Sequence, residues 1–241
     1  MYGMYGYGYG YGLDPTIILV LIGVALSLWA QGRVNSTFSR YSRVRSMTGM
    51  TGAEAARRLL NAQGIYDVTV QQIAGELTDH YDPRTKTVNL SQSVYGATSV
   101  AAIGVAAHEC GHAMQDNEGY VPLRFRSALV PVANFGSSLS WPLILLGLVF
   151  GGLGSPLVEI GILMFSLAVL FQLVTLPVEY NASARAVRLL DAQGILAGEE
   201  VNGTRKVLNA AALTYVAAAA TSILQLLRLI ILFGGRNRRD N

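Results

Sequence analysis

The sequence predicts a mainly α-helical membrane protein, with three to four transmembrane helices and a small α+β domain on the cytoplasmic side. Three observations support this fold class. Of the 241 residues, 51% are hydrophobic and 14% are charged, whereas soluble proteins average about 25% charged residues. Apolar runs of bilayer-spanning length recur along the chain. Lysine and arginine occur in blocks separated by long stretches that contain neither, a pattern typical of membrane topology.

The N-terminal part is predicted to be a tail followed by one transmembrane helix. Residues 1–12 repeat Tyr and Gly without a charge, so we expect disorder and no cleaved signal peptide. Residues 13–32 are expected to form the first transmembrane helix, because they are apolar up to the point where Arg33 begins a polar region. Asp14 and Pro15 supply a helix start, an N-cap residue followed by proline in the first turn.

Residues 33–126 are predicted to form the α+β domain outside the membrane. An amphipathic helix is expected over residues 51–63, where Gly64 stops it. Short strands are expected at residues 68–70 and 87–90, on either side of an Asp-Pro-Arg turn. These strands would form a hairpin, although the second strand could instead pair with an extended peptide substrate through a free edge.

The rest of the chain is predicted to return through the membrane. Residues 127–178 contain no basic residue and are expected to form a transmembrane helical hairpin. Residues 179–206 are expected to form an amphipathic helix, and residues 207–235 a C-terminal apolar helix before a basic tail at residues 236–241. Arg228 lies inside that apolar run, and a full crossing would put the basic tail outside the cell. The sequence therefore leaves the fourth crossing open.

The distribution of charge predicts the orientation. Ten of the 18 Lys and Arg residues lie in residues 33–126 and four in residues 185–206, while residues 1–32 and 127–184 have none. Because basic loops stay on the cytoplasmic side, we expect both basic segments to face the cytoplasm. These blocks do not resemble a nucleic-acid-binding patch, so no nucleic-acid partner is expected. The single cysteine, Cys110, excludes an internal disulfide. It is expected to be a small buried spacer, although it could modulate a metal site.

Residues 108–112 are His-Glu-Cys-Gly-His, an HExxH pentad in an apolar stretch. On a helix, His108 and His112 lie on one face, where they can bind one zinc ion together. Glu109 then lies beside the metal, where it can take a proton from water. The simpler alternative is a helix with two hydrogen-bonded histidines that bind nothing. Gly111 could allow close backbone approach near the metal, or only a plain contact between helices.

The predicted topology selects a third metal ligand, which a catalytic zinc usually needs. The pentad lies between the first two spans, and the chain returns to that side after two crossings, at Glu179. Glu159 falls in the far-side turn and fails this test. Glu179 could instead pair with Arg185 or Arg188 at the membrane surface. Other carboxylates on the same side remain open: Asp116, Glu118, Asp191, Glu199 and Glu200.

Three motifs together resemble one family. They are LTDHYDP at residues 77–83, AAHECGHAMQD at residues 106–116 and LPVEYNA at residues 176–182. Over nearly all of residues 13–235 the chain resembles the YugP-type neutral zinc metallopeptidases, integral-membrane proteins of bacteria. The resemblance implies that residues 33–126 form a zincin-like domain carrying the HExxH helix. It also implies a multi-pass protein of the bacterial plasma membrane, and the distribution of charge described above puts the active site towards the cytoplasm.

The resemblance further implies roles for individual residues. His108, His112 and Glu179 would bind Zn²⁺, and Glu109 would be the catalytic residue. The chain is more distantly similar to the membrane gluzincins of the CAAX prenyl protease and heat-shock protease group. That group usually has Asp where this chain has Ser183, so the orientation of one histidine ligand is an open point.

The function expected from these residues is that of a membrane zinc endopeptidase. It would cleave membrane or membrane-adjacent polypeptides near the cytoplasmic face, with Glu109 as general base. His80, Tyr81 and Tyr180 are candidates for stabilising the oxyanion, although His80 could be a structural hydrogen-bonding residue in a turn.

Two other classes of function compete with this expectation. The main alternative is a non-catalytic, zinc-braced membrane scaffold or adaptor. A transporter or channel is disfavoured, because the predicted spans contain few polar residues. Besides the lipid bilayer and a polypeptide substrate, an oligomer or a regulatory membrane partner remains open.

Overall fold

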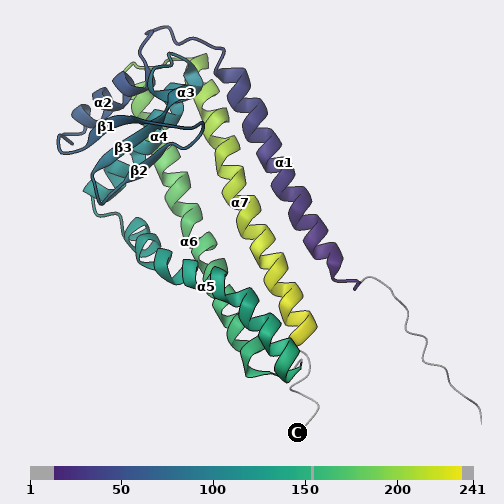
Figure 1. The fold of residues 1–241 in the computed structure, drawn as a ribbon. Helices are drawn as coiled ribbons and strands as arrows, with labels where there is room; N and C mark the ends of the chain where they lie inside the picture. The colour runs from purple at the N-terminus through teal and green to yellow at the C-terminus, as the bar shows by residue number, and fades with distance from the viewer. Residues whose placement is uncertain (1–13, 153–154, 235–241) are drawn as a thin grey trace, which may run out of the picture.

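Four long helices run side by side, and a small α+β layer covers one end of them (Figure 1). The computed structural model describes residues 14–152 and 155–234. Within this part of the chain, four helices are long and apolar enough to cross a membrane by length and composition. These helices are α1 (Ile17–Tyr41), α5 (Val121–Gly151), α6 (Pro156–Ala192) and α7 (Glu199–Phe233). The expected mainly helical architecture with up to four candidate spans is confirmed.

The small layer consists of three strands and three further helices. Its elements are α2 (Gly52–Ala62), β1 (Thr69–Ile73), β2 (His80–Asp82), β3 (Thr87–Ser91), α3 (Gln92–Tyr95) and α4 (Val100–Asn117). Thr51 begins α2 with a capping box, in which its side chain and that of Glu54 each bond the other's backbone N–H. The apolar face of α2 packs on α4, where Leu59, Leu60 and Ile103 are fully or almost fully buried.

The sheet differs from the expected hairpin between residues 68–70 and 87–90. The strand order is β1-β3-β2, with β1 parallel to β3 and β2 antiparallel to it. The tight turn after Asp82, whose carboxylate accepts bonds from Arg84 and Thr85, joins β2 to β3 instead. Because β3 is the central strand and all its residues are buried, it has no edge for a peptide substrate. That expectation is wrong, and the free edges belong to β1 and β2.

The helices α1, α6 and α7 extend beyond the expected segments. α1 continues beyond the apolar run to Tyr41 and so reaches the α+β layer. Residues 179–206 do not form a separate helix, because α6 continues through Pro177 to Ala192 and α7 begins at Glu199. A proline removes one backbone hydrogen bond and does not have to end a helix. Consequently Glu179 lies in the middle of a long rigid helix.

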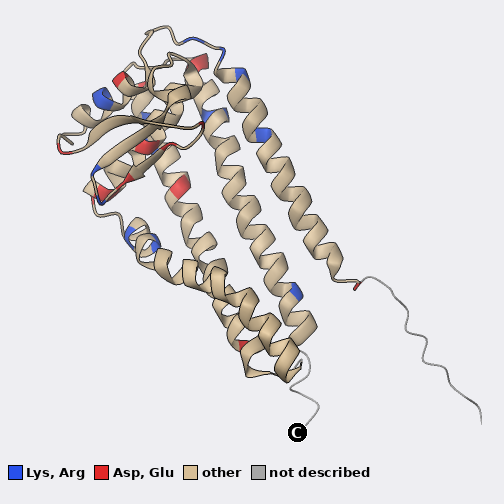
Figure 2. Cartoon of the chain, viewed as in Figure 1, with Lys and Arg blue, Asp and Glu red and all other residues tan. Residues whose placement is uncertain are grey.

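α7 packs beside α1 along the helical layer. It is long and apolar enough to be the fourth transmembrane helix, which the sequence left open. Thr221 donates to the carbonyl of Gly23 at 3.1 Å, and Arg228 lies 3.3 Å from the Asp14 carboxylate. The arginine inside the apolar run therefore has a counter-ion at the end of the bundle away from the sheet. Figure 2 shows that charged residues gather at the sheet end and are sparse along the rest of the four helices. The tails expected at residues 1–12 and 236–241 lie outside the described residues.

Candidate metal centre

His108 and His112 lie one turn apart on α4, the helix at the centre of the α+β layer. Ser99 caps the start of α4 by accepting a bond from the Ala102 N–H at 3.2 Å. The two imidazole rings lie edge to face with their centroids 4.7 Å apart. His112 is buried and His108 is nearly so. The pentad thus presents both rings on one face of a well-packed helix, as its spacing predicts.

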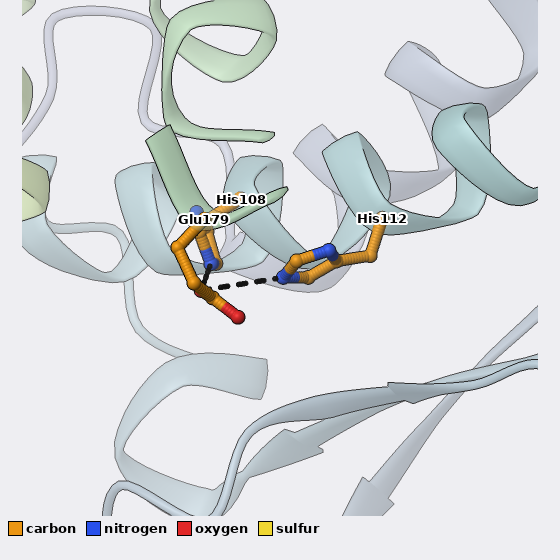
Figure 3. A group of neighbouring side chains, drawn as sticks. All are labelled: His108, His112 and Glu179. Atoms are coloured by element: carbon orange, nitrogen blue, oxygen red, sulfur yellow. Dashed lines mark hydrogen bonds and ion pairs between the residues drawn. The ribbon is translucent and has the colours of Figure 1, made fainter. Parts of the chain in front are cut away.

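Glu179 reaches these histidines from α6, which crosses α4 at close range. The two helices meet closely at Gly111, where a Cβ would lie 2.6 Å from the carbonyl oxygen of Ala182. Glu179 lies one turn before Ala182 on α6, and its side chain is 2% exposed. Figure 3 shows His108, His112 and Glu179 pointing towards one another. The glycine therefore serves a contact between helices, and that contact places the carboxylate.

The three side chains converge through defined atoms. Oε2 of Glu179 lies 3.2 Å from Nε2 of His108 and 3.6 Å from Nε2 of His112. One ligand atom from each residue lies within 4.8 Å of the other two, which is a geometry able to hold a metal ion. Glu159, which the topology argument rejected, is in the first turn of α6, far along the helix from Glu179.

The other nitrogen of each imidazole is held by a side chain next to it. Nδ1 of His108 lies 3.1 Å from Oγ of Ser183, and Nδ1 of His112 lies 3.0 Å from Oε1 of Gln115. When each Nδ1–H donates to these oxygens, the lone pairs of both Nε2 atoms face Glu179. Ser183, whose role the sequence left open, therefore lies where it can orient the His108 ring.

Gln115 joins the two helices of the site. Its side chain is fully buried, and its amide nitrogen donates to the Val178 carbonyl and to Oδ1 of Asn181, both at 2.9 Å. Arg185 donates to the same Asn181 oxygen at 2.7 Å. These bonds tie α4 to the turn of α6 that carries Glu179. The LPVEYNA motif thus supplies both the carboxylate and its support.

The alternative carboxylates have other partners or positions. Asp116 accepts a bond from the Tyr81 hydroxyl at 2.8 Å and pairs with Lys86 at 3.2 Å. Glu118 pairs with Arg185 at 2.6 Å. Glu200 accepts the backbone N–H of Met47 at 2.7 Å, and Glu199 bonds Asn202. Glu179 is the acidic residue that the described structure groups with the two histidines.

The sequence argument gave no role to several residues at the site, among them Arg126 and Tyr215. Arg126 of α5 lies 3.5 Å from Oε1 of Glu179, and Tyr215 of α7 lines the same cavities as Glu109 and Glu179. Among the described residues, Nε of Arg126 is a buried nitrogen without a hydrogen-bond partner. Arg126 is the last basic residue before residues 127–184, which contain no Lys or Arg. This position alone does not indicate a role at the site, and only the packing of α5 against α6 brings Arg126 to Glu179.

The predicted oxyanion candidates lie in different places. His80 lines a cavity with the metal-binding group, but its ring is within 2.9 Å of the Thr78 carbonyl and 3.2 Å of the Asn89 amide. Tyr81 lines the same cavity and donates to Asp116. Tyr180 follows Glu179 on α6 and points elsewhere, into a cavity beside α1 and α7 that does not include the histidines. Tyr215, by contrast, lines both cavities together with Glu109 and Glu179.

Cys110 faces away from the metal-binding group. Its side chain is fully buried against α2, with the sulfur 3.6 Å from the Ala56 carbonyl. Burial raises the pKa of the thiol far above its usual range, so the thiolate needed for metal binding is disfavoured. The interpretation of Cys110 as a small buried residue agrees with this position.

Two cavities reach the site from different sides. A cavity of about 460 Å³ opens past Arg126 and Pro131 on the α5 side. A second, of about 290 Å³, lies between Val34 of α1 and Leu208 of α7. Both are lined by the same five residues of the site: Asp79, His108, Glu109, Glu179 and Tyr215. The candidate metal-binding group of His108, His112 and Glu179 is therefore lined by cavities on two sides, with His112 on the wall of the first cavity alone.

The donor set fits zinc. Two imidazole nitrogens and one carboxylate oxygen are a common ligand set for zinc in hydrolytic enzymes, in which a fourth position is left open. Here the cavities supply that open side, and both imidazoles are held by their far nitrogens. The structure supports a metal site of this type, while the identity of the metal stays a prediction.

Together, the four apolar helices and the His-His-Glu group define a membrane protein with a candidate metal centre in its helical core. The family model described as "Putative neutral zinc metallopeptidase" matches residues 16–234, and the chain belongs to this family. It is 49% identical over 224 residues to a protein of Bacillus subtilis (strain 168) named "Putative membrane protease YugP". The match covers 93% of this chain and 98% of that relative. No solved structure matches the chain.

Proposed function

We propose that the chain is an integral-membrane zinc endopeptidase that hydrolyses peptide bonds of membrane or membrane-adjacent proteins. The observation that carries this proposal is the pairing of an anchored His-His-Glu group with Glu109 on the same helix. Glu109 is buried and lines both cavities that reach the metal-binding group. A purely structural zinc site is normally closed by four protein ligands.

The chemistry follows from the residues around the cavities. Zinc bound by His108, His112 and Glu179 would polarise a carbonyl and lower the pKa of water from about 15.7 towards about 7. Glu109 would accept a proton from the attacking water and pass it to the leaving amine. Arg126 and Tyr215 are donors beside the carboxylates and are better placed than Tyr180 to stabilise an oxyanion. His80 also lines the cavity of about 460 Å³ and stays a candidate for stabilising the oxyanion.

The substrate we propose is a polypeptide in an extended conformation. Cavities on both flanks share His108, Glu109 and Glu179, so a chain longer than the site could enter on one side and leave on the other. The free edge of β2, which carries His80 and Tyr81 on the cavity wall, could bond such a chain in place of the central strand β3. Both features support a polypeptide rather than a small solute.

We place the site at the cytoplasmic face of the bacterial plasma membrane. The basic residues of segments 33–126 and 185–206 belong to the sheet end of the molecule, and basic segments stay in the cytoplasm. The zincin-like α+β domain would then lie on the cytoplasmic side, and the first turn of α1 and the last turn of α7 would lie on the other side. An oligomer or a regulatory membrane partner remains compatible with this arrangement.

The test compares wild type with Glu109→Gln in detergent, by zinc per mole and by cleavage of casein and of a membrane protein. Glu199→Gln, which changes an exposed carboxylate at the start of α7, is the matched control. We expect all three proteins to hold about one zinc each, and only the Glu109 variant to be inactive. Zinc in all three proteins without cleavage by any would favour the scaffold alternative. A wild-type protein that holds no metal would overturn the site itself.

A further inference from the structure

A cavity of about 670 Å³ lies between α1, α6 and α7 and shares no lining residue with the two cavities at the metal centre. On α1 its lining residues recur at helical spacing from Arg33 to Tyr41, and on α7 they recur from Lys206 to Leu213. Each helix thus turns one face to the cavity, and Tyr180 of α6 forms part of its wall. We propose that this cavity binds the phosphate headgroup of an anionic phospholipid.

The charge of the cavity favours an anion. Its lining includes three cations, Arg33, Arg40 and Lys206, and no carboxylate. None of the three forms an ion pair with a residue in the described part of the chain. Like charges that face one space repel one another unless an anion lies between them. Arg228, further along α7, shows the contrast, because it has Asp14 as a partner.

Polar donors and one ring contact complete the cavity. The guanidinium carbon of Arg40 lies 5.6 Å from the centre of the Tyr41 ring, and this cation–π contact restrains the Arg40 side chain. The hydroxyls of Thr37 and Tyr180 and the amide of Asn209 also line the space. A phosphate group accepts bonds from all of these donors, and arginine in particular suits phosphate oxygens.

The position of the cavity along α1 and α7 favours a lipid as the source of this phosphate. Arg33 is the first basic residue of the chain, directly after the apolar run of α1, and Lys206 directly precedes a run of α7 that has no charged residue before Arg228. The cavity therefore lies where both helices leave the apolar layer. Trp29, one turn before Arg33, is 56% exposed, as expected of an aromatic anchor at the interface.

Apolar residues of α7 continue beyond the cavity towards the middle of the helix. Leu213 lines the cavity, and Val216 of α7 is exposed just beyond it. Acyl chains could lie along these residues while the headgroup remains with the cations, whereas a free phosphate would make no use of them. In the proposed orientation this is the cytoplasmic leaflet, whose anionic lipids attract basic residues near the surface. The inference depends on the membrane placement and not on peptide hydrolysis.

The test measures lipid binding to the full chain in detergent by native mass spectrometry. The probes are short-chain phosphatidylglycerol, phosphatidylcholine with the same acyl chains, and inorganic phosphate. We expect about one tightly bound phosphatidylglycerol per chain, at least about tenfold weaker phosphatidylcholine binding, and no displacement by equimolar phosphate. Equal binding of the two lipids would overturn the proposal. Displacement by phosphate would assign the site to a soluble phosphate compound instead and would also overturn it.

Variants locate the binding. We expect Arg33→Gln, Arg40→Gln and Lys206→Gln together to weaken phosphatidylglycerol binding about a hundredfold, at about fivefold per charge. The matched control removes three exposed cations outside the cavity, through Arg43→Gln, Arg124→Gln and Arg205→Gln. Equal losses in both triple variants, or no loss in the first, would show that the cavity is not the site. If the first triple variant unfolds, the single variant Lys206→Gln replaces it, and we expect its phosphatidylglycerol binding to be about fivefold weaker.

Discussion

Gly111 of α4 lies directly against Ala182 of α6, so that a Cβ at position 111 would lie 2.6 Å from the Ala182 carbonyl oxygen. Carbon and oxygen atoms do not approach this closely in a packed interior, so the crossing requires glycine. The crossing brings Glu179 to Nε2 of His108 and Ser183 to its Nδ1. The candidate metal centre therefore depends on a contact that contains none of its ligands.

Gly111→Ala tests this dependence. The added methyl group must push α6 away, at a cost of about 1–3 kcal/mol of unfolding free energy, and Glu179 moves with α6. We expect zinc affinity to fall at least about tenfold, measured by competition with a chelator. Gly32→Ala is the control, because a Cβ at that position of α1 meets nothing within 4 Å. Unchanged zinc binding in Gly111→Ala would show that the ligands do not depend on the crossing.

Ser183→Ala tests the support of His108. Without Oγ the ring loses its hydrogen-bond partner at Nδ1, so we expect about 10- to 100-fold weaker zinc binding with little change in thermal stability. Ser183→Asp should bind zinc at least as well as wild type, because a carboxylate is a stronger acceptor. Zinc titrations of the three proteins measure both effects, and equal affinities throughout would contradict this role of Ser183.

Gln115 allows its two roles to be separated. Gln115→Leu removes the acceptor for His112 and both donors to α6, so we expect loss of zinc affinity and of stability. Gln115→Glu keeps the acceptor and loses the donors. It should therefore lose stability by about 1–3 kcal/mol but bind zinc better than the leucine variant. Chemical denaturation and zinc titration give the two readouts, and identical zinc affinities would rule out the anchoring role.

The pH dependence of zinc binding follows from His112. Burial disfavours its charged form, but the hydrogen bond and charge of Glu179 and the charge of Glu109 outweigh this and raise the pKa of His112 above 6.5 in the metal-free protein. Protonated imidazole cannot bind zinc, so affinity should begin to fall at a pH above 6.5 as the solution is acidified. Zinc titrations at a series of pH values measure the onset.

The same shift predicts the stability of the metal-free protein. Because the pKa of His112 is raised on folding, the stabilisation is fully present below pH 6.5 and is lost as the pH rises through the raised value. Glu179→Gln removes the main attraction, so it should move the onset of both effects to lower pH. The same onset in that variant would mean that Glu179 does not set the pKa of His112.

The local elements were largely predictable from the sequence. The i, i+4 spacing of His108 and His112 places both on one helical face regardless of the fold around it. Long apolar runs predict long helices, since backbone groups within a membrane must bond within their own segment. The sheet was less predictable, because β1 and β2 carry similar local signals. Their pairing with β3 depends on contacts between segments distant in the chain.

The site was only partly predictable. Counting membrane crossings placed Glu179 near the pentad, and the structure groups it with both histidines. Arg126 and Tyr215 could not be found in this way, because they come from α5 and α7, and only the packing of these helices brings them to the cavity. Tyr180 shows the converse, since a residue adjacent to Glu179 in sequence points into a different cavity.

The sequence by itself determined the HExxH helix, the apolar segments and the distribution of charge, because each depends on residue spacing within one element. Only the tertiary structure decided which nitrogen of each histidine is anchored, which side chains surround Glu109 and where the unpaired cations of α1 and α7 meet. These features depend on the angle and closeness at which helices cross. Such crossings are set by many small packing contacts, and at this site one of them is the close approach of Gly111 to Ala182.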